Sequence, residues 1–361
     1  MKKRAENSHR RIKVLHRLGM MAMVAAFSAS LAQAQLTLPQ ASQKATLEQT
    51  IGLAEVRVTY SRPKVNDREI WGGIVPYDQV WRVGANENTV IEFSHDVEIE
   101  GQPLAAGTYG LHAIPGQKEW TVIFSNNSTS WGSFSYSEAE DALRVKVKPR
   151  ENPHHELLTL DLVDQSNEGA TLAINWASLQ VPVQIAIDNH GIVLANIRNE
   201  LRSSPGFSWV GWNQAANFSF QNNINHEEAL GWVNQSIQIE ERFENLLVKS
   251  QLLGQMDRKE EAEAAMANAL QAATPLNLHN YARQLIAQGE PKKAMEIFKM
   301  NSEKNPDAWF IDIGMARGYS ALGEYKKAAE SMRAAIPKAP EQQRQVYENL
   351  AKQLDNGESI N

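Results

Sequence analysis

The sequence predicts two domains of different class: an all-β antiparallel sandwich followed by an all-α solenoid of paired helices. Residues 43–189 are filled by short β-branched or alternating runs, separated by turns that contain Gly and Pro. From residue 190 onward this pattern stops. In the second half, small residues return at intervals of 32 to 34 residues, a spacing typical of helical repeats. Together these observations predict the fold class and place the boundary near the middle of the chain.

The first 34 residues have the composition of a secretory signal peptide. Basic residues precede an apolar stretch from Leu18 to Leu31, and the small residues of Ala32-Gln33-Ala34 predict cleavage after Ala34. The apolar stretch is shorter than the roughly 20 residues that span a bilayer, although an uncleaved anchor is an alternative. We therefore expect an exported protein, periplasmic or extracellular, without a membrane span once the signal is removed.

Size and composition narrow the functional classes. Removing 34 of 361 residues leaves 327, which is enough for two domains that each bury a core. The chain contains no cysteine, which excludes disulfides, thiolate nucleophiles and thiolate metal ligands. Its net charge is -6, and no block of basic residues follows the signal. Nucleic acid is therefore not an expected partner, because its binding depends on Lys and Arg meeting phosphates.

The first domain is expected to consist of eight or nine short antiparallel strands. Between them lie turn sequences such as Gly72-Gly73 and Pro115-Gly116. Crossover helices are missing, which argues against a parallel α/β fold. The strand-like runs are Thr46 to Tyr60, Thr89 to Glu100, Thr108 to Ile114, Trp120 to Ser125, Leu143 to Val147, Leu157 to Val163, Thr171 to Trp176 and Leu179 to Ile187.

Several motifs of this domain occur in a specific order and spacing. They are Tyr60-Ser61-Arg62-Pro63, Trp81-Arg82-Val83-Gly84-Ala85-Asn86-Glu87-Asn88-Thr89, Ala106-Gly107-Thr108-Tyr109-Gly110-Leu111-His112, Ser130-Trp131-Gly132-Ser133-Phe134 and Asp141-Ala142-Leu143-Arg144. Over about 145 residues they resemble the bacterial domain of unknown function 2911 family. The resemblance implies an exported β-sandwich-like domain and brings no established activity with it.

These motifs also supply the candidate ligand-binding residues of the β-domain. Guanidinium groups donate paired hydrogen bonds to carboxylate, phosphate or sugar oxygens, and an aromatic ring in a Ser- and Gly-rich loop offers a stacking face. A small molecule or glycan is the expected ligand. The alternative is structural, with Arg82 and Asn86 tying an irregular connection to the sheet. The candidates are Arg62, Arg82, Asn86, Glu87, His112, Trp131, Asp141 and Arg144.

No catalytic residue, metal site or cofactor is predicted. His154-His155-Glu156 resembles a metal cluster, but successive strand residues point to opposite faces, so at most His154 and Glu156 share one. Glycosidase acids come from distant strands and leave no local spacing. A carbohydrate-active or other hydrolase, with Glu87 and Asp141 as its acids, is therefore kept as an alternative function.

The second domain is predicted from a recurring pattern of small and large residues. Ala229, Ala262, Ala294 and Ala328 lie 33, 32 and 34 residues apart, and a larger apolar residue follows each by four positions. The pattern resembles the tetratricopeptide repeat, in which a small residue lets two helices approach closely. A linker helix and loop are expected at 190–206. Four repeats are expected at 210–243, 243–276, 275–308 and 309–342, with a closing helix from Gln345 to Leu354 inside a domain of 207–354.

Such solenoids expose a concave groove along the first helix of each pair, the A helix, and bind an extended peptide or a partner helix there. We therefore expect a non-enzymatic protein that binds a protein or peptide partner through this groove. Two alternatives are that these side chains are only solvated, and that the array forms a structural homodimer. The candidate groove residues are Asn213, Asn217, Asn245, Lys249, Asn280, Arg283, Asp312 and Arg317.

Overall fold

A computed structural model describes residues 38–361. The predicted signal peptide and its cleavage site lie outside these residues. The chain divides into two compact units, with the boundary between Val193 and Leu194. The first unit is built of strands and the second of helices, which confirms the predicted fold class. No helix within residues 38–361 combines the length and apolarity that a membrane crossing requires.

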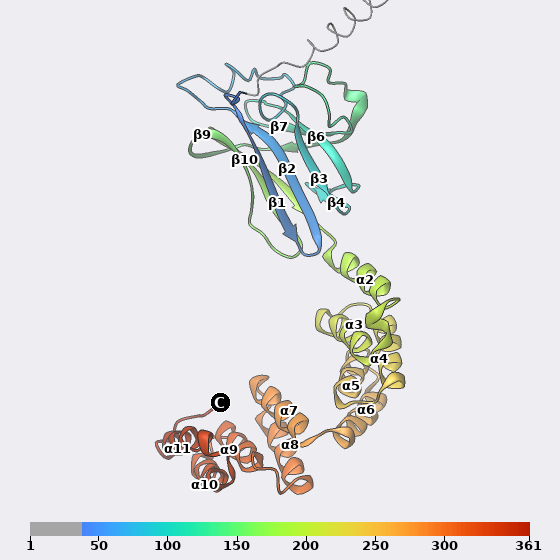
Figure 1. The fold of residues 1–361 in the computed structure, drawn as a ribbon, viewed down its shortest axis with the longest axis vertical. Helices are drawn as coiled ribbons and strands as arrows, with labels where there is room; N and C mark the ends of the chain where they lie inside the picture. Colours follow the sequence, from blue (N-terminus) through green and yellow to red (C-terminus); the bar gives the residue numbers. More distant parts are fainter. Residues whose placement is uncertain (1–37) are drawn as a thin grey trace, which may run out of the picture. The chain divides into compact units, whose positions relative to one another are not determined.

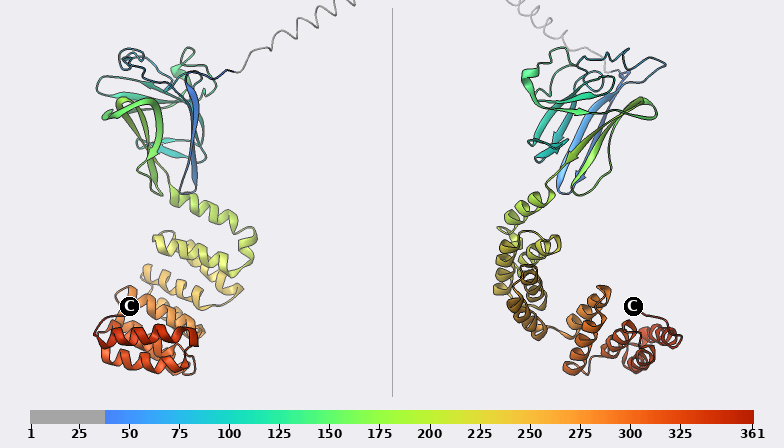
Figure 2. Two further views of the ribbon diagram at one scale, coloured as in Figure 1. Left: turned by 60° about the vertical axis from the view of Figure 1, so that its left-hand side comes forward. Right: turned by 180° about the vertical axis from the view of Figure 1, so that it is seen from behind.

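The first unit consists of two antiparallel sheets that face each other (Figures 1 and 2). The six-stranded sheet contains, in spatial order, β1 (Gln43–Ile51), β2 (Ala54–Arg62), β3 (Thr89–Phe93), β6 (Gly107–Ile114), β7 (Trp120–Ser125) and β8 (Asp141–Val147). The four-stranded sheet contains β5 (Gln102–Leu104), β4 (Val97–Ile99), β10 (Gly169–Ala186) and β9 (Arg150–Val163). Pro103 and Pro153 both lie in edge strands of the second sheet, where a strand tolerates the missing N–H donor.

The core lies between the sheets because each strand alternates its side chains. In β2, Val56 and Val58 are fully buried while Arg57 between them is exposed. Trp71, Trp81, Trp120 and Trp176 gather in this core, and the closest pair of rings, Trp71 and Trp120, lies 4.8 Å apart. Edge-to-face packing of this kind stabilises a core beyond the area that it buries. The aromatic residues of the sandwich therefore serve mainly as core.

The observed strands differ from the predicted runs at four places, so that residues 38–361 contain ten strands, of which β5 falls in no predicted run. The run from Thr46 to Tyr60 is a hairpin that turns at Gly52, whose φ of 59° favours glycine. The run from Thr89 to Glu100 contributes β3 to one sheet and β4 to the other. Conversely, two predicted runs merge into β10, which carries a bulge at Ala177. A tight turn or bulge interrupts pairing without interrupting the apolar pattern.

The second unit contains four antiparallel helix pairs and a closing helix, preceded by α2 (Asn189–Glu200) and the short η3 (Ser204–Phe207). The pairs are α3 (Trp209–Asn222) with α4 (His226–Ile239), α5 (Phe243–Gln255) with α6 (Lys259–Ala272), α7 (Pro275–Ala287) with α8 (Pro291–Lys304), and α9 (Ile311–Ala321) with α10 (Tyr325–Ala335). Helix α11 (Glu341–Asp355) follows the last pair.

The repeat pattern accounts for how the pairs pack. Ala229, Ala294 and Ala328 are fully buried in the second helices of their pairs, as a close helix approach requires. The second repeat differs, because Ala262 is only half-buried and Ala265 and Ala269 carry the burial in α6. Each A helix is followed, within two residues, by a residue of positive φ. These are Asn223, Asp257, Gly289 and Gly323, with φ of 54°, 58°, 79° and 77°.

Candidate functional site

The helical unit carries a groove lined by α3, α5 and α7. Seven of its lining side chains are carboxamides and three are aromatic, and Glu244 is the one charged residue among them. The candidates Asn213, Asn217 and Asn280 all lie in this lining. The complete set is Asn213, Asn217, Phe220, Gln221, Phe243, Glu244, Leu247, Val248, Gln251, Asn277, Asn280, Tyr281 and Gln284. We refer to this surface as the amide groove.

The amide groove has the donors and acceptors that a peptide backbone needs. A carboxamide both donates and accepts hydrogen bonds, as a peptide unit does. Within residues 38–361, the side chains of Asn217, Gln251 and Asn280 make no hydrogen bond, and the buried Oδ1 of Asn213 has no partner. Phe243 and Tyr281 pack edge to face at 5.9 Å beside them. The groove can therefore bind a polar extended chain without neutralising a charge.

The other groove candidates lie outside this lining. Asn245 is fully buried, accepts the Arg242 backbone N–H at 3.0 Å and donates to the Glu240 carbonyl at 2.8 Å, which caps the start of α5. Asp312 forms an ion pair with Lys338 at 2.6 Å. Sequence spacing places these residues on A helices, but it does not show whether the helix itself uses the side chain.

The two remaining arginine candidates and Lys249 also lie apart from the amide groove. Lys249 is half-buried on α5. Arg283 is exposed on α7. Arg317 on α9 donates to the carbonyl of Ile360 at 2.8 Å, and burial lowers the pKa of its guanidinium, helped by the charge of Arg283. Arg283 on α7 and Arg317 on α9 therefore define a second, positively charged surface on the A helices.

In the β-domain, the side chains of Arg62 and Asn86 donate hydrogen bonds to neighbouring strands and loops. Arg62 donates to the Leu158 carbonyl at 3.0 Å and to Thr159 Oγ1 at 2.8 Å, which ties the end of β2 to β9. Asn86 adopts a φ of 62° and donates to the Ser42 carbonyl at 3.0 Å. These contacts satisfy irregular backbone and neighbouring strands, so they support the structural interpretation of both residues.

Five polar side chains meet at the loop of residues 130–136, two of them from the loop itself. His112 is 2% exposed, and its Nδ1 lies 3.1 Å from Ser133 Oγ. The Asp141 carboxylate accepts a hydrogen bond from the Tyr136 hydroxyl at 2.7 Å and an ion-paired one from Arg144. The other carboxylate oxygen, Oδ1, is buried and has no partner among the described residues. The sequence motif contained Ser133 but not Tyr136, and only the fold shows that both side chains contact these residues.

Burial sets the protonation states in this cluster. It raises the pKa of Tyr136 to about 12, with the hydrogen bond to Asp141 acting in the same direction. It lowers the pKa of His112, against the opposing charge of Asp141. At neutral pH the imidazole and phenol are thus both uncharged. Within residues 38–361 no hydrogen bond joins His112 to Asp141, so the Ser133, His112 and Asp141 side chains do not form the relay of a nucleophilic triad.

The outer surface of the same loop is apolar. Trp131 is 57% exposed and Phe134 is 87% exposed, while Gly132 between them has a φ of 70°. A Cβ at Gly132 would lie 2.7 Å from Nη1 of Arg82, so the loop approaches this half-buried arginine as closely as a glycine allows. Burial lowers the pKa of Arg82. Glu87 is half-buried on the preceding connection. The loop therefore covers the polar cluster and presents two aromatic rings to solvent.

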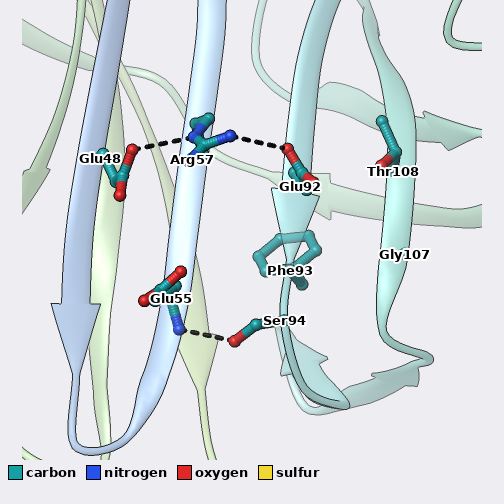
Figure 3. Close-up of a pocket in the computed structure, with 8 residues that line it drawn as sticks. All are labelled: Glu48, Glu55, Arg57, Glu92, Phe93, Ser94, Gly107 and Thr108. Carbon is teal, nitrogen blue, oxygen red and sulfur yellow. Dashed lines mark hydrogen bonds and ion pairs between the residues drawn. The ribbon is translucent and has the colours of Figure 1, made fainter.

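A further hollow lies on the face of the six-stranded sheet, where Arg57 on β2 reaches Glu48 on β1 and Glu92 on β3 (Figure 3). The Nε–O distance to Glu48 is 2.9 Å, and Nη1 lies 3.7 Å from Glu92. The hydrogen bond to Glu48 is the main reason that the pKa of Arg57 is raised. All three side chains are about half-exposed, so this ladder is a solvated cross-strand contact.

Metal-ligating residue types are dispersed over the molecule. His154 Nε2 and Glu156 Oε2 lie 3.5 Å apart on the exposed side of β9. In the part of the chain that the structure describes, no three His, Asp or Glu side chains are grouped so that they could hold an ion.

Together, the observations define a two-domain protein in which a β-sandwich precedes tetratricopeptide-like helix pairs. Residues 42–185 match the family model described as "Protein of unknown function (DUF2911)", which confirms the resemblance of the β-domain. No curated protein matches the sequence. Among solved structures, the chain is similar to YrrB, described as a TPR protein with an unusual peptide-binding site. The identity is 13% and the TM-score 0.26, with 45% of this chain and 84% of that chain covered. The helical-repeat class of the second unit follows from its own helix pairs and their packing.

Proposed function

We propose that the chain is an exported, non-enzymatic binding protein whose helical repeats bind an extended segment of a partner protein in the amide groove. The observation that supports this most directly is the set of seven carboxamides along α3, α5 and α7. Asn277 is bound to Thr274 and Glu244, but the side chains of Asn217, Gln251 and Asn280 make no internal hydrogen bond. Such free amides beside apolar rings are suited to a polypeptide, which alternates polar backbone with side chains. The near absence of charge in the lining favours an uncharged stretch of the partner.

The test is selection of peptides from a displayed library, followed by affinity measurement on the full chain. The combined Asn217→Ala and Asn280→Ala variant is expected to weaken the selected peptides by at least about tenfold. Lys299→Ala, which changes an exposed residue of α8, is the matched control. Unchanged affinity in the double variant would disprove the role of the amide groove.

For the β-domain we propose recognition of a small molecule or glycan at the loop of residues 130–136. Support comes from the exposed rings of Trp131 and Phe134, and from a polar hollow beside the loop. Aromatic faces flanked by amides are a common way of binding sugars. A glycan array should show binding that the Trp131→Ala variant loses and the Leu53→Ala variant, changed at an exposed apolar residue of the β1–β2 turn, retains. Absence of any bound glycan or small molecule would refute this assignment.

The rival functions have direct tests. A hydrolase would turn over a bound glycan, and Glu87→Gln would abolish that turnover while binding persisted. A structural homodimer would show twice the monomer mass in light scattering. Export predicts that the mature protein, isolated from the envelope or medium, begins at Gln35. Recovery of the protein from the cytoplasm with residues 1–34 still attached would contradict the proposed location.

A further inference from the structure

Residues 359–361 lie on α9 as a short peptide would. After α11 ends, Gly357 with a φ of 79° reverses the chain. The Ile360 backbone N–H then donates to Ser320 Oγ at 3.1 Å, and its carbonyl accepts from Arg317 at 2.8 Å. The side chain of Ile360 is only 8% exposed and belongs to the apolar cluster of Ile313 and Leu354. An aliphatic anchor and two flanking backbone hydrogen bonds thus hold this segment on an A helix.

The repeat places Arg317 in register with the amide groove. Counting back six residues from the positive-φ residue that follows each A helix gives the same position in all four repeats. These residues are Asn217, Gln251, Arg283 and Arg317. Equivalent positions of successive repeats form a line along a solenoid. The line changes from neutral amides in the first two repeats, where both residues face the amide groove, to guanidinium groups in the last two.

Arg283 and Arg317 occupy equivalent positions on α7 and α9, which pack against each other, and neither has an acidic partner among residues 38–361. The charge of Arg283 contributes to the lowered pKa of Arg317 and also to that of His279. Within residues 38–361, neither arginine forms an ion pair with a carboxylate. By contrast, Arg198 and Arg258 of the helical unit each pair with a glutamate, and that hydrogen bond is the main reason that their pKa is raised. An adjacent pair of cations without a counter-charge is an arrangement that an anionic ligand stabilises.

We propose that residues 359–361 occupy, within their own chain, a second peptide-binding site on α9, and that a partner segment with an aliphatic residue followed by carboxylates displaces them. The aliphatic residue takes the place of Ile360, and the carboxylates pair with Arg283 and Arg317. This inference extends the proposed function and rests on peptide binding by the A helices. The tethered segment competes with the partner because its local concentration is high. Release of residues 359–361 from α9 is thereby coupled to binding of the partner segment.

The experiment uses three fluorescein-labelled synthetic peptides and the full chain. The first carries residues 356–361 followed by two aspartates, the second has two asparagines instead, and the third replaces the isoleucine of the first with serine. Ile360→Ser, which weakens the tethered segment, should bind the first peptide at least about tenfold more tightly than wild type does. Ile360→Val, which keeps the anchor, should behave as wild type does. The third peptide should bind weakly to every variant.

The contribution of charge is tested in the Ile360→Ser background. There, Arg283→Gln should weaken the acidic peptide by about fivefold or more and leave the neutral peptide unchanged, with a difference that disappears at high salt. If Ile360→Ser with Arg283 intact bound the acidic and neutral peptides equally well, the proposed pairing of carboxylates with the two arginines would be overturned. Equal affinities of wild type and Ile360→Ser for the acidic peptide would show that residues 359–361 do not compete with the peptide.

A measurement on the wild-type chain covers the possibility that Ile360→Ser disturbs α11. Saturating acidic peptide should accelerate hydrogen exchange at the Ile360 backbone amide, because displacement frees it from Ser320 Oγ. Unchanged exchange with bound peptide contradicts displacement. The combined Asn217→Ala and Asn280→Ala variant should not affect these results, which separates a failure of this site from a failure of the amide groove.

Discussion

Arg62 and Asn86 of the β-sandwich donate their hydrogen bonds to nearby strands and loops, whereas Asn217 and Asn280 of the helical repeats face an open groove. The difference follows from how the two folds satisfy their backbone. A helix pairs its own N–H and C=O groups, so polar side chains on its surface are available to a ligand. A sandwich with long connections leaves loop backbone to be satisfied by side chains. The side chains of Asn217 and Asn280 are therefore free of backbone contacts, whereas those of Arg62 and Asn86 are not.

The largest effect is expected in the core of the sandwich. Trp120 is 1% exposed, and its ring packs edge to face against Trp71 at 4.8 Å. Trp120→Ala should reduce the free energy of unfolding of the β-domain by about 3–5 kcal/mol, because it leaves a large cavity. Chemical denaturation followed by near-ultraviolet circular dichroism measures this loss. The helical transition, followed at 222 nm, serves as the internal control and should remain in place.

The next effect concerns His279, a buried residue of the helical unit whose ring nitrogen Nδ1 has no hydrogen-bond partner among the described residues. His279 on α7 packs against the rings of Phe298 and Phe310, and its Nδ1 has no partner among the described residues. Burial, with the charges of Arg283 and Arg317, lowers its pKa to about 4. The unfolded chain therefore binds a proton first as the pH falls below about 6.5. The contribution of neutral His279 is complete above that pH and is lost as the pH approaches 4.

His279→Gln should remove this pH dependence. Between pH 7 and pH 4, wild type should lose about 2–3 kcal/mol of helical-unit stability more than the variant does. Urea unfolding at a series of pH values, monitored at 222 nm, gives both curves. Parallel curves would show that His279 is solvated or paired in the folded protein, which would also weaken the contrast between the two domains.

A smaller effect separates the two kinds of amide on the A helices. Asn245 is fully buried and hydrogen-bonded to the chain around the start of α5, so Asn245→Ala should lower the stability of the helical unit by about 2 kcal/mol. Asn280→Ala changes an exposed residue of the amide groove and should lower it by less than about 0.5 kcal/mol. Thermal unfolding of the two single variants makes the comparison. A reversed order would mean that the groove amides are structural.

Sequence patterns predicted most of the fold because both domains depend on periodic burial. The spacing of Ala229, Ala294 and Ala328 reports a close helix contact that only a small side chain permits, and all three are fully buried. The strand pattern of β2 is equally regular. Turns inside an apolar run were not predicted, since Gly52 and Leu53 interrupt the pairing for only two residues. Burial of a face leaves a periodic trace in the sequence, and the end of a strand often does not.

The candidate site was predicted less completely, because function depends on which polar atoms remain free. Asn213, Asn217 and Asn280 were found from their positions on A helices, but Gln251 and Gln284 lie in the same groove and were not singled out. Their selection would have required the repeat to be aligned by the turn residues rather than by the alanines. Asp141 and Arg144 were chosen from one motif, but their ion pair along β8 and their joint contact with Tyr136 of the preceding loop are properties of the fold.

The smallest effect is expected on the exposed face of the sandwich, at the cross-strand ladder of Figure 3. Arg57, Glu48 and Glu92 are each about half-exposed, so water and salt screen their attraction. Arg57→Gln should leave the denaturation midpoint of the β-domain almost unchanged, and the small loss should vanish at high ionic strength. Arg62→Gln is the matched comparison, since Arg62 lies on the same strand and is bound to the Leu158 carbonyl. If both substitutions had equal effects on the denaturation midpoint, Arg62 at the end of β2 would contribute no more to stability than the solvated Arg57. The contrast between scaffold and available side chains would then not hold within the sandwich.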